Sequence, residues 1–309
     1  MIKRTLYFGN PAYLSLSNGQ LIVRLPEVEK NDSLNETFKK EAHASIPIED
    51  VGIVVLDHRQ ITLTQALLDA LLQNNTVTMV CNGSHHPEGI LLTLDGNTIQ
   101  SERYRDQIDA SEPLRKQMWA QTVMQKIKNQ AASLKFLNRE YSYLTSLHKN
   151  IKSGDADNCE ATAAAYYWST IFPGVEGFRR NREGIPPNNY LNYGYALLRA
   201  TMARSIVGAG LLPTLGIHHR NRYNAFCLAD DLMEPYRPYV DVLVNKTMLM
   251  NGLKDDIPRQ VKTDLLQIPA IDVTIDGEKS PLMNATYRTA VSVVKCFEGG
   301  QRKILYPEM

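Results

Sequence analysis

The sequence predicts an α+β protein with a β-rich domain over residues 1–95, a linker over residues 96–110 and a larger, mainly α-helical domain over residues 111–309. Three observations support this organisation. Short apolar runs separated by turn residues dominate the first part, apolar residues at helical spacing dominate the last part, and polar residues without periodicity lie between them. A length of 309 residues fits two domains, at a prior of roughly 150 residues per domain.

The N-terminal part is expected to contain a hairpin over Ala12–Val23, because Asn18-Gly19 tolerates the positive φ angles that a two-residue turn requires. The apolar run Val51–Asp57 (VGIVVLD) predicts a buried strand, and apolar residues at helical spacing predict a helix over Ile61–Leu72. Two further strands are expected over Thr76–Val80 and Ile90–Leu94.

The C-terminal part is expected to begin with a long helix. Ser111 is its predicted N-cap, since Glu112 and Pro113 suit a first helical turn, and apolar residues then recur at helical spacing until near Tyr141. Further helices are predicted over Glu160–Ile171, Tyr190–Val207 and Leu282–Cys296, together with a short strand pair that includes Ile271–Thr274 before Asp276-Gly277.

Composition excludes several classes of protein. The chain is 43% hydrophobic and 22% charged, and it has no apolar run near the ~18 residues that a membrane span needs, so no membrane association is expected. Its first residues lack the apolar core of a signal peptide, which favours a cytoplasmic location. The four cysteines are scattered without a CxxC pair, which argues against a disulfide framework and a thiolate zinc site.

Familiar catalytic motifs are missing as well. The sequence contains no GxxxxGK[ST] phosphate loop, no GxGxxG after a strand, no GxSxG elbow and no HExxH. Nucleotide hydrolases, common dinucleotide enzymes and serine hydrolases are therefore poor candidates.

A basic zone lies between Gly177 and Ala229, although the formal net charge of the chain is only +1. Its one acidic residue is Glu183, and its basic residues are Arg179, Arg180, Arg182, Arg199, Arg204, Arg220 and Arg222. The tyrosines in or near it are Tyr166, Tyr167, Tyr190, Tyr193, Tyr195 and Tyr223. Guanidinium groups bind phosphate oxygens bidentately and tyrosines stack on unpaired bases, so this zone suits a nucleic acid. The alternative is a set of solvated helix faces.

A candidate metal site starts from the stretch Leu215–Pro235 (LGIHHRNRYNAFCLADDLMEP). Asp231 and Glu234 would share one helix face if a helix began at Asp230 or Asp231, and His219 would precede that helix. Carboxylates with one imidazole suit Mg²⁺ or Mn²⁺ better than a closed zinc site. The alternative is a pair of acids that favour a helix N-terminus, beside histidines on a surface loop.

The ligand interpretation needs another carboxylate. Glu160 is the best candidate because it opens an alanine-rich helix whose small residues permit close packing, although a simple helix N-terminal charge is the alternative. The pair His85-His86 could bind a metal with Cys81 and Glu88, but a turn between two strands explains this pair better.

Three motifs occur in the order of a known family. They are CEATAAAYYW (Cys159–Trp168), FRRNREGIPPNNYLNYGYALLRA (Phe178–Ala200) and LGIHHRNRYNAFCLADDLMEPYRP (Leu215–Pro238). Over essentially its whole length the chain resembles the universal CRISPR-associated endonuclease that acts as the integrase of spacer acquisition, in its type II-like variety. The resemblance implies that the β-rich domain is a dimerisation domain and that the helical domain is catalytic and binds metal and DNA.

The resemblance also implies a set of site residues. The family holds a divalent metal with a glutamate, a histidine and a further acid, which fall here on Glu160, His219 and Glu234. His219 is preferred to its neighbour because the family pattern is a glycine, two residues and a histidine, and Gly216 fits that register. Asp231 matches a further acid near the metal. DNA contacts are expected from Arg179, Arg180, Arg182, Arg220, Arg222, Tyr167 and His218. Alanine at position 161, where many members have glycine, leaves these ligands unaffected.

The function that this resemblance implies is insertion of new spacers into a CRISPR array, by attack of a DNA 3′-hydroxyl on repeat-end phosphodiesters with Mg²⁺ or Mn²⁺ as cofactor. The implied partners are double-stranded DNA with single-stranded 3′ ends, CRISPR repeat DNA, a second copy of the chain and a small partner protein, with the type II effector nuclease as a further candidate. Two alternatives stay open: a DNA-binding scaffold without catalysis, and a general repair nuclease for branched DNA.

Overall fold

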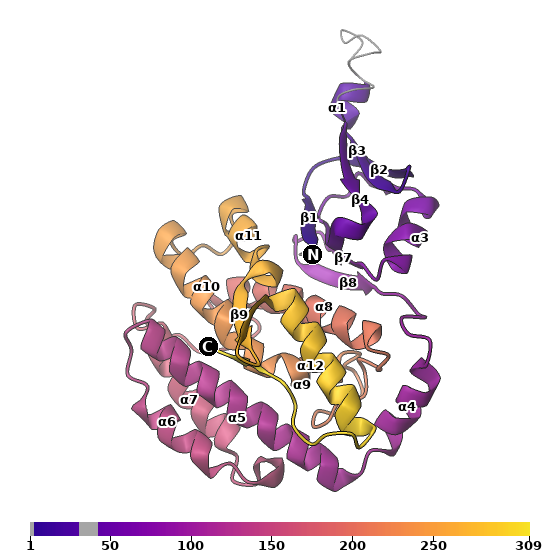
Figure 1. Ribbon diagram of the computed structural model, residues 1–309. Coiled ribbons are helices and arrows are strands. Elements are labelled where there is room, and N and C mark those ends of the chain that lie inside the picture. The colour runs from indigo at the N-terminus through magenta and orange to yellow at the C-terminus, as the bar shows by residue number, and fades with distance from the viewer. Residues whose placement is uncertain (1–2, 31–42) are drawn as a thin grey trace. The chain divides into compact units, whose positions relative to one another are not determined.

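The structure, a computed structural model, describes residues 3–30 and 43–309 (Figure 1). It divides into two compact units, Met1–Asp95 and Gly96–Met309. Strands dominate the first unit and helices the second, which confirms the predicted α+β class. Among the described residues, no helix combines the length and the hydropathy that crossing a membrane would require.

The first unit consists of two four-stranded sheets and short helices. Its elements are β1 (Arg4–Phe8), β2 (Ala12–Ser17), β3 (Gln20–Arg24), α1 (Pro26–Glu29), β4 (Ala44–Pro47), the 3-10 helix η1 (Ile48–Asp50), β5 (Val51–Leu56), β6 (Ile61–Leu63), α3 (Gln65–Gln73), β7 (Val77–Cys81) and β8 (Pro87–Leu91). One sheet has the order β1-β5-β7-β8, in which only β8 is antiparallel to its neighbour, and the other has the order β4-β3-β2-β6. Buried Leu14, Val54 and Leu67 come from the two sheets and α3 and share one core.

Most predictions for the first unit are confirmed, and two are partly wrong, one of them the strand over Ile90–Leu94, since β8 covers Pro87–Leu91. Asn18 and Gly19 have φ angles of 49° and 71° at the β2–β3 turn, and β5 is buried along almost its full length. The predicted helix over Ile61–Leu72 begins later, because Ile61–Leu63 pairs with β2 as β6 and Thr64 then caps α3 by accepting a hydrogen bond from the Leu67 amide. Pairing with a neighbouring strand overrides local periodicity here.

The second unit is mainly helical. Its elements are α4 (Gln100–Asp109), α5 (Glu112–Phe136), α6 (Ser142–Leu147), η2 (His148–Asn150), η3 (Ser153–Asp155), α7 (Cys159–Ile171), α8 (Asn188–Gly208), α9 (Cys227–Met233), η4 (Glu234–Tyr236), α10 (Arg237–Asn251), α11 (Arg259–Leu265), η5 (Ile268–Ala270), β9 (Asp272–Ile275), β10 (Glu278–Pro281), α12 (Leu282–Phe297) and β11 (Pro307–Glu308). The predicted N-cap is confirmed, since the Ser111 hydroxyl accepts a hydrogen bond from the Leu114 amide, but α5 ends five residues before the predicted end at Tyr141.

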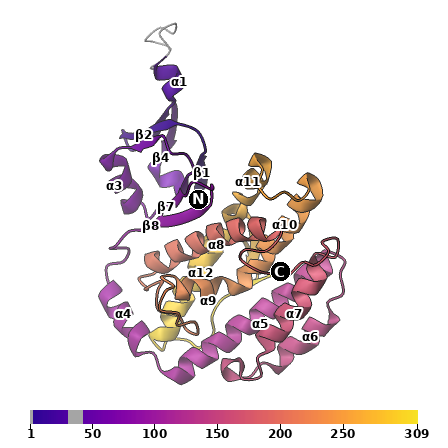
Figure 2. The ribbon, with the colours of Figure 1, turned by 180° about the vertical axis from the view of Figure 1, so that it is seen from behind.

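Two long helices organise this unit. Helix α5 lies beside α6 and α7 in both views of Figures 1 and 2, and it also packs against η4. Helix α8 packs against α9, α10 and α12 and is buried on nearly every side, including the rings of Tyr190 and Tyr193. These contacts bring α5, α7 and η4 together although they are far apart in the sequence, and the candidate site lies where they meet.

The segment 96–110, predicted to be a linker, belongs to the helical unit instead. It contains α4, which packs against α12. Arg103 donates a hydrogen bond to the Ala209 carbonyl at 2.9 Å, and Gln107 bonds to the backbone of the segment that follows α8. The low apolar content of this segment misled the prediction, because polar side chains rather than apolar ones attach α4 to its neighbours.

Gly194 on α8 is required by the close approach of α10. A Cβ atom at this position would lie 2.6 Å from Val240 Cγ1. We expect Gly194→Ala to lower the free energy of unfolding of this unit by about 1–3 kcal/mol through overpacking. Urea unfolding followed by tryptophan fluorescence measures this, since both tryptophans, Trp119 and Trp168, lie in the second unit. Gly174→Ala is the matched control because nothing surrounds that position, and equal effects of the two substitutions would contradict the prediction.

Candidate functional site

Glu160 lies in the first turn of α7, where a capping carboxylate fixes the backbone. Asp155 accepts hydrogen bonds from the Cys159 amide at 2.9 Å and from the Glu160 amide at 3.0 Å. Asn158 has a left-handed φ of 54°, which turns the chain into the helix. The Glu160 side chain is 24% exposed, so its carboxylate lies at the edge of the protein interior and is open to solvent.

His219 lies on the loop between α8 and α9, and the carboxylate of Asp231 closes this loop. Asp231 is fully buried and accepts a hydrogen bond from the His218 amide at 2.9 Å, and it also contacts His219 Nδ1. Gly216 leaves the space for this arrangement, because a Cβ atom there would lie 2.4 Å from the His219 carbonyl oxygen and 2.8 Å from Asp231 Oδ2. With Nδ1 held by a carboxylate, Nε2 is the ring nitrogen that is left for a ligand.

Trp119 of α5 fixes the two histidine rings. It stacks on His218 with ring centroids 4.1 Å apart and meets His219 edge-on at 5.4 Å. The hydrogen bond with Asp231 raises the pKa of His219, whereas burial lowers the pKa of His218. The protonated form is therefore favoured at His219, whose ring bonds to the Asp231 carboxylate, and disfavoured at His218.

Glu234 is the first residue of η4 and is buried. Its Oε1 atom lies 3.0 Å from Arg237 and its Oε2 atom lies 2.6 Å from Lys126 Nζ. Burial favours the neutral acid, but Arg237 and then Lys126 outweigh that effect and hold the pKa of Glu234 below its ordinary value. Glu234 is therefore a buried carboxylate that favours the ionised form.

Lys126 brings the two candidate glutamates together. Its Nζ atom lies 2.6 Å from Glu160 Oε1 as well as 2.6 Å from Glu234 Oε2, and the contact to Glu160 is a hydrogen bond. The contact to Glu234 is an ion pair. His219 is near enough for the charges of both glutamates to favour its protonated form. In residues 3–30 and 43–309, no three His, Cys, Asp or Glu side chains are already arranged around one empty metal position.

The predicted helix around Asp231 and Glu234 is wrong in its bounds. Helix α9 begins at Cys227 and ends at Met233, and Pro235 prevents a continuous α-helix through Glu234 because it has no amide hydrogen. Asp231 consequently faces the histidine loop, whereas Glu234 faces α5. The two acids do not act as one i, i+3 pair.

The predicted DNA contacts divide into exposed and buried groups. Arg179, Arg182, Arg220 and Arg222 are exposed, and His218 presents the edge of a ring that Trp119 covers on one face. Arg180 is half-buried and donates hydrogen bonds to the side chains of Asn188 and Asn192. Four of the five predicted arginines are therefore accessible from solvent.

Tyr167 was expected to contact DNA, and the structure contradicts this. Its side chain is fully buried and its hydroxyl donates a hydrogen bond to Asp241 Oδ2 at 2.9 Å. Tyr190, Tyr193 and Tyr195 are buried as well, whereas Tyr223 is 81% exposed. Most tyrosines of the basic zone thus belong to the helical core, because α8 is surrounded by other helices.

A hollow of about 550 Å³ opens beside His219. Its lining includes three arginines, Arg115, Arg220 and Arg222, and the polar side chains of Asn221 and Asn224. Among the described residues no acidic side chain lines it, so it presents positive charge directly next to the candidate imidazole ligand.

Behind the glutamates, Asp241 forms a buried network with the hydroxyls of Tyr167 and Tyr195. Burial raises the pKa of Asp241 to about 7, although the two tyrosine hydroxyls and the guanidinium groups of Arg237 and Arg180 oppose that shift. The ordinary value in an unfolded chain is about 3.9. Between about pH 3.9 and about pH 7, Asp241 is protonated in the folded protein but ionised in the unfolded chain. The stability that Asp241 contributes is therefore complete at low pH and is lost as pH rises toward 7.

We expect Asp241→Asn to remove this pH dependence, because the amide does not ionise. The free energy of unfolding of the unsubstituted chain, relative to that of the variant, should fall by up to about 1.4 kcal/mol per pH unit between about pH 5 and about pH 7. Urea unfolding followed by tryptophan fluorescence measures the difference. Asp256→Asn, at an exposed position, is the control, and a pH-independent difference for Asp241→Asn would contradict the expectation.

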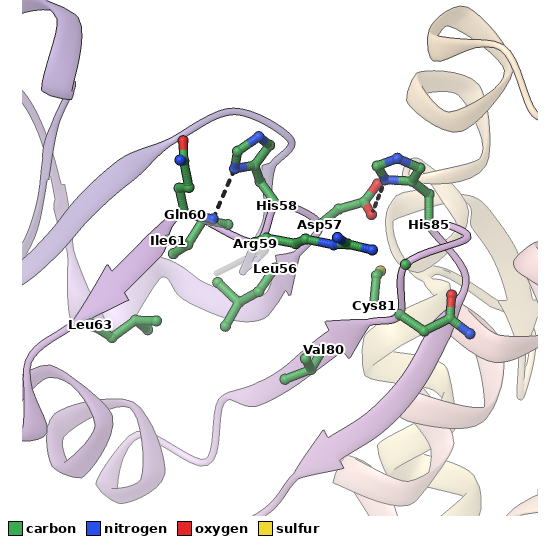
Figure 3. A pocket seen from close by; sticks show the side chains of 12 residues that line it. Leu56, Asp57, His58, Arg59, Gln60, Ile61, Leu63, Val80, Cys81 and His85 are labelled. Carbon is green, nitrogen blue, oxygen red and sulfur yellow. Dashed lines mark hydrogen bonds and ion pairs between the residues drawn. The ribbon is translucent and has the colours of Figure 1, made fainter.

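A second hollow, of about 700 Å³, lies in the first unit (Figure 3). Asp57, at the carboxyl end of β5, accepts a hydrogen bond from the Tyr7 hydroxyl at 2.6 Å and pairs with His85 Nδ1 at 2.8 Å. His85 and His86 lie in the turn that joins β7 to β8, which confirms the turn interpretation of this pair. The contact between His85 and Asp57 therefore helps to hold this turn in place.

Sequence reasoning missed Lys126, Trp119, Arg237 and Asp155. A signal for two of them exists: Lys126 follows Trp119 by seven residues, which places both on one face of α5 among buried apolar residues. A lysine in an apolar helix stripe requires a buried partner. The acids that serve as partners come from α7 and η4, so only the packing identifies them.

The family model for "CRISPR associated protein Cas1" matches residues 7–262. A CRISPR-associated endonuclease Cas1 from Neisseria meningitidis serogroup C (strain 8013) is 34% identical over 280 residues, which are 90% of this chain and 86% of that relative.

Solved structures share the fold at lower identity. A casposase bound to integration product superposes with a TM-score of 0.77 at 18% identity, over 98% of this chain and 92% of the casposase chain. A chain of a Cas6-RT-Cas1–Cas2 complex gives a TM-score of 0.70 at 19% identity, over 98% of this chain and 36% of that chain. These similarities extend across both units.

Proposed function

The chain belongs to the Cas1 family of CRISPR-associated proteins, and we propose that it is a metal-dependent DNA endonuclease and integrase that inserts new spacers into a CRISPR array. One observation carries the proposal: Glu160 and Glu234, from separate helices, converge on a single cation position, 2.6 Å from the ammonium group that lies there. The motifs that suggested this family from the sequence contain both residues.

The donor set suits a hard divalent cation. Two carboxylates and the Nε2 atom of His219 would hold Mg²⁺ or Mn²⁺, both of which prefer oxygen ligands and tolerate one imidazole. Glu234 Oε2 is buried and faces a positive charge at 2.6 Å, which supports cation binding at this position. When bound, the cation would polarise a phosphodiester and stabilise the negative charge on the leaving oxygen.

The protein's own residues position the reacting groups. Asp231 holds the imidazole through Nδ1, and Trp119 limits its rotation. Arg220 and Arg222 line the hollow beside His219 and would bind phosphate oxygens of the target strand. In strand transfer the 3′-oxygen of the incoming DNA bonds to phosphorus at a repeat end, and the bond from phosphorus to the 3′-oxygen of the neighbouring nucleotide breaks.

The partners follow from the same family. We assign the β-rich unit to dimerisation, and we expect protospacer DNA with single-stranded 3′ ends, CRISPR repeat DNA and a small partner protein to bind this chain. The casposase with integration product and the complex that contains Cas2 support these assignments, because both contain a chain of this fold. The type II effector nuclease is a further proposed partner.

Strand transfer tests the proposal. A labelled duplex with 3′ overhangs is incubated with a repeat-bearing plasmid, the partner protein and Mn²⁺ or Mg²⁺, and His219→Ala and Glu160→Ala are compared with the unsubstituted chain. The expected result is joined product that both substitutions abolish while DNA binding is retained. Binding without joining by the unsubstituted chain would support a scaffold instead, and cleavage of branched DNA without preference for the repeat would support a repair nuclease.

A further inference from the structure

Lys126 is a lysine in an unusual position. It lies midway along α5, its side chain is only 10% exposed, and its helix neighbours Val123 and Ile127 are buried in the core. A buried ammonium group must be paired with opposite charge, because desolvation of an isolated charge is unfavourable. Its partners here are the two glutamates that are the proposed metal ligands.

The charges of this cluster cancel without any bound ion. Glu160 and Glu234 carry two negative charges, and Lys126 and Arg237 carry two positive charges at contact distances of 2.6 to 3.0 Å. A divalent cation bound to the same two carboxylates would share their oxygens with the ammonium group. Like charges at that separation repel strongly in a poorly solvated site, so both cannot be held by the same carboxylates.

We propose that Lys126 is a displaceable internal cation, which occupies the position between Glu160 and Glu234 and must leave it when a divalent cation binds. This inference rests on the proposed function. The lysine then lowers the affinity of the site for the divalent cation, and it stabilises the metal-free fold by preventing repulsion between the two carboxylates. Arg237 has no such role, since it pairs with the other oxygen of Glu234 and its guanidinium group lies over the Tyr195 ring.

The exposure of the cluster provides the route of exchange. The Glu160 side chain is 24% exposed, whereas those of Lys126 and Glu234 are 10% and 5% exposed. A cation from solvent therefore reaches Glu160 first, at the open edge of the cluster. The lysine has a flexible four-carbon stem, which lets the ammonium group withdraw without movement of α5.

The test is Mn²⁺ affinity, measured by titration calorimetry on the metal-free, full-length chain. Lys126→Met removes the charge and keeps an unbranched side chain that is one atom shorter, and we expect it to bind Mn²⁺ about tenfold more tightly. Its thermal midpoint without metal should be lower than that of the unsubstituted chain, and Mn²⁺ should raise it by more. Lys126→Arg, which keeps the charge, should bind no more tightly than the unsubstituted chain.

Two outcomes separate this inference from the proposed function. Suppose that Mn²⁺ binds the unsubstituted chain, does not bind the Glu160→Gln variant, and binds the Lys126→Met variant with unchanged affinity. The proposed displacement of Lys126 is then wrong, and the proposed metal site is retained. If Mn²⁺ binds no variant, or binds regardless of Glu160→Gln, the metal site itself is wrong. A crystal structure of the unsubstituted chain with Mn²⁺ gives an answer independent of variant folding: the Lys126 ammonium group should be withdrawn from both carboxylates, and its retention beside a bound Mn²⁺ would overturn the proposal.

Discussion

Glu234→Gln is expected to reduce joining of DNA to a repeat-bearing plasmid on the order of 1,000-fold, because the substitution removes a ligand charge but keeps the shape of the side chain. The glutamine side chain would still fit between Lys126 and Arg237, whose contacts of 2.6 and 3.0 Å to the native carboxylate position the side chain. The rate of formation of joined product, measured at saturating DNA, is the relevant quantity.

Glu112→Gln is the matched control for this substitution. Glu112 forms an exposed ion pair with Lys116 one turn along α5, at 2.8 Å, and surface pairs of this kind contribute little. Joining by that variant should equal that of the unsubstituted chain. Joining by Glu234→Gln within about tenfold of the unsubstituted rate would exclude Glu234 as a metal ligand.

Asp231→Asn is expected to reduce joining by about 100-fold while the chain stays folded. The Asp231 carboxylate accepts from the backbone amides of His218 and His219 and holds His219 Nδ1. An asparagine must turn either its oxygen or its amino group toward the imidazole. If the amino group faces Nδ1, the ring proton moves to Nε2, and the nitrogen that should bind the metal is blocked.

Asp230→Asn separates this effect from a general loss of charge on α9. Asp230 pairs with Arg199 at 2.7 Å and accepts a hydrogen bond from the Asn224 side chain at 2.7 Å, whereas the bonds to His218 and His219 come from Asp231. Its substitution should change joining much less than Asp231→Asn does. Mn²⁺ affinity measured on both variants provides a second readout, since only Asp231→Asn should weaken it, and equal behaviour of the two variants would contradict the positioning role.

Local patterns in the sequence were enough for the elements whose formation depends on neighbouring residues. Asn18-Gly19 predicted the hairpin turn, the apolar run after Asp50 predicted β5, and Ser111 predicted the start of α5. They failed where a distant contact decides the outcome. Residues 61–63 became a strand because β2 pairs with them, and residues 100–109 became a helix that polar side chains attach to the segment after α8.

The same division holds for the candidate site. Residue type and spacing made Glu160, His219, Asp231 and Glu234 candidates, and the resemblance to a known family through three motifs implied their roles. Lys126 was not among them, because its importance depends on two carboxylates that approach it from α7 and η4. Tyr167 was predicted to contact DNA because the sequence does not show that its side chain is buried and bonded to Asp241. Sequence thus determined which chemical groups are available, and packing decided which of them meet, since burial and ion pairing depend on distances between segments far apart in the chain.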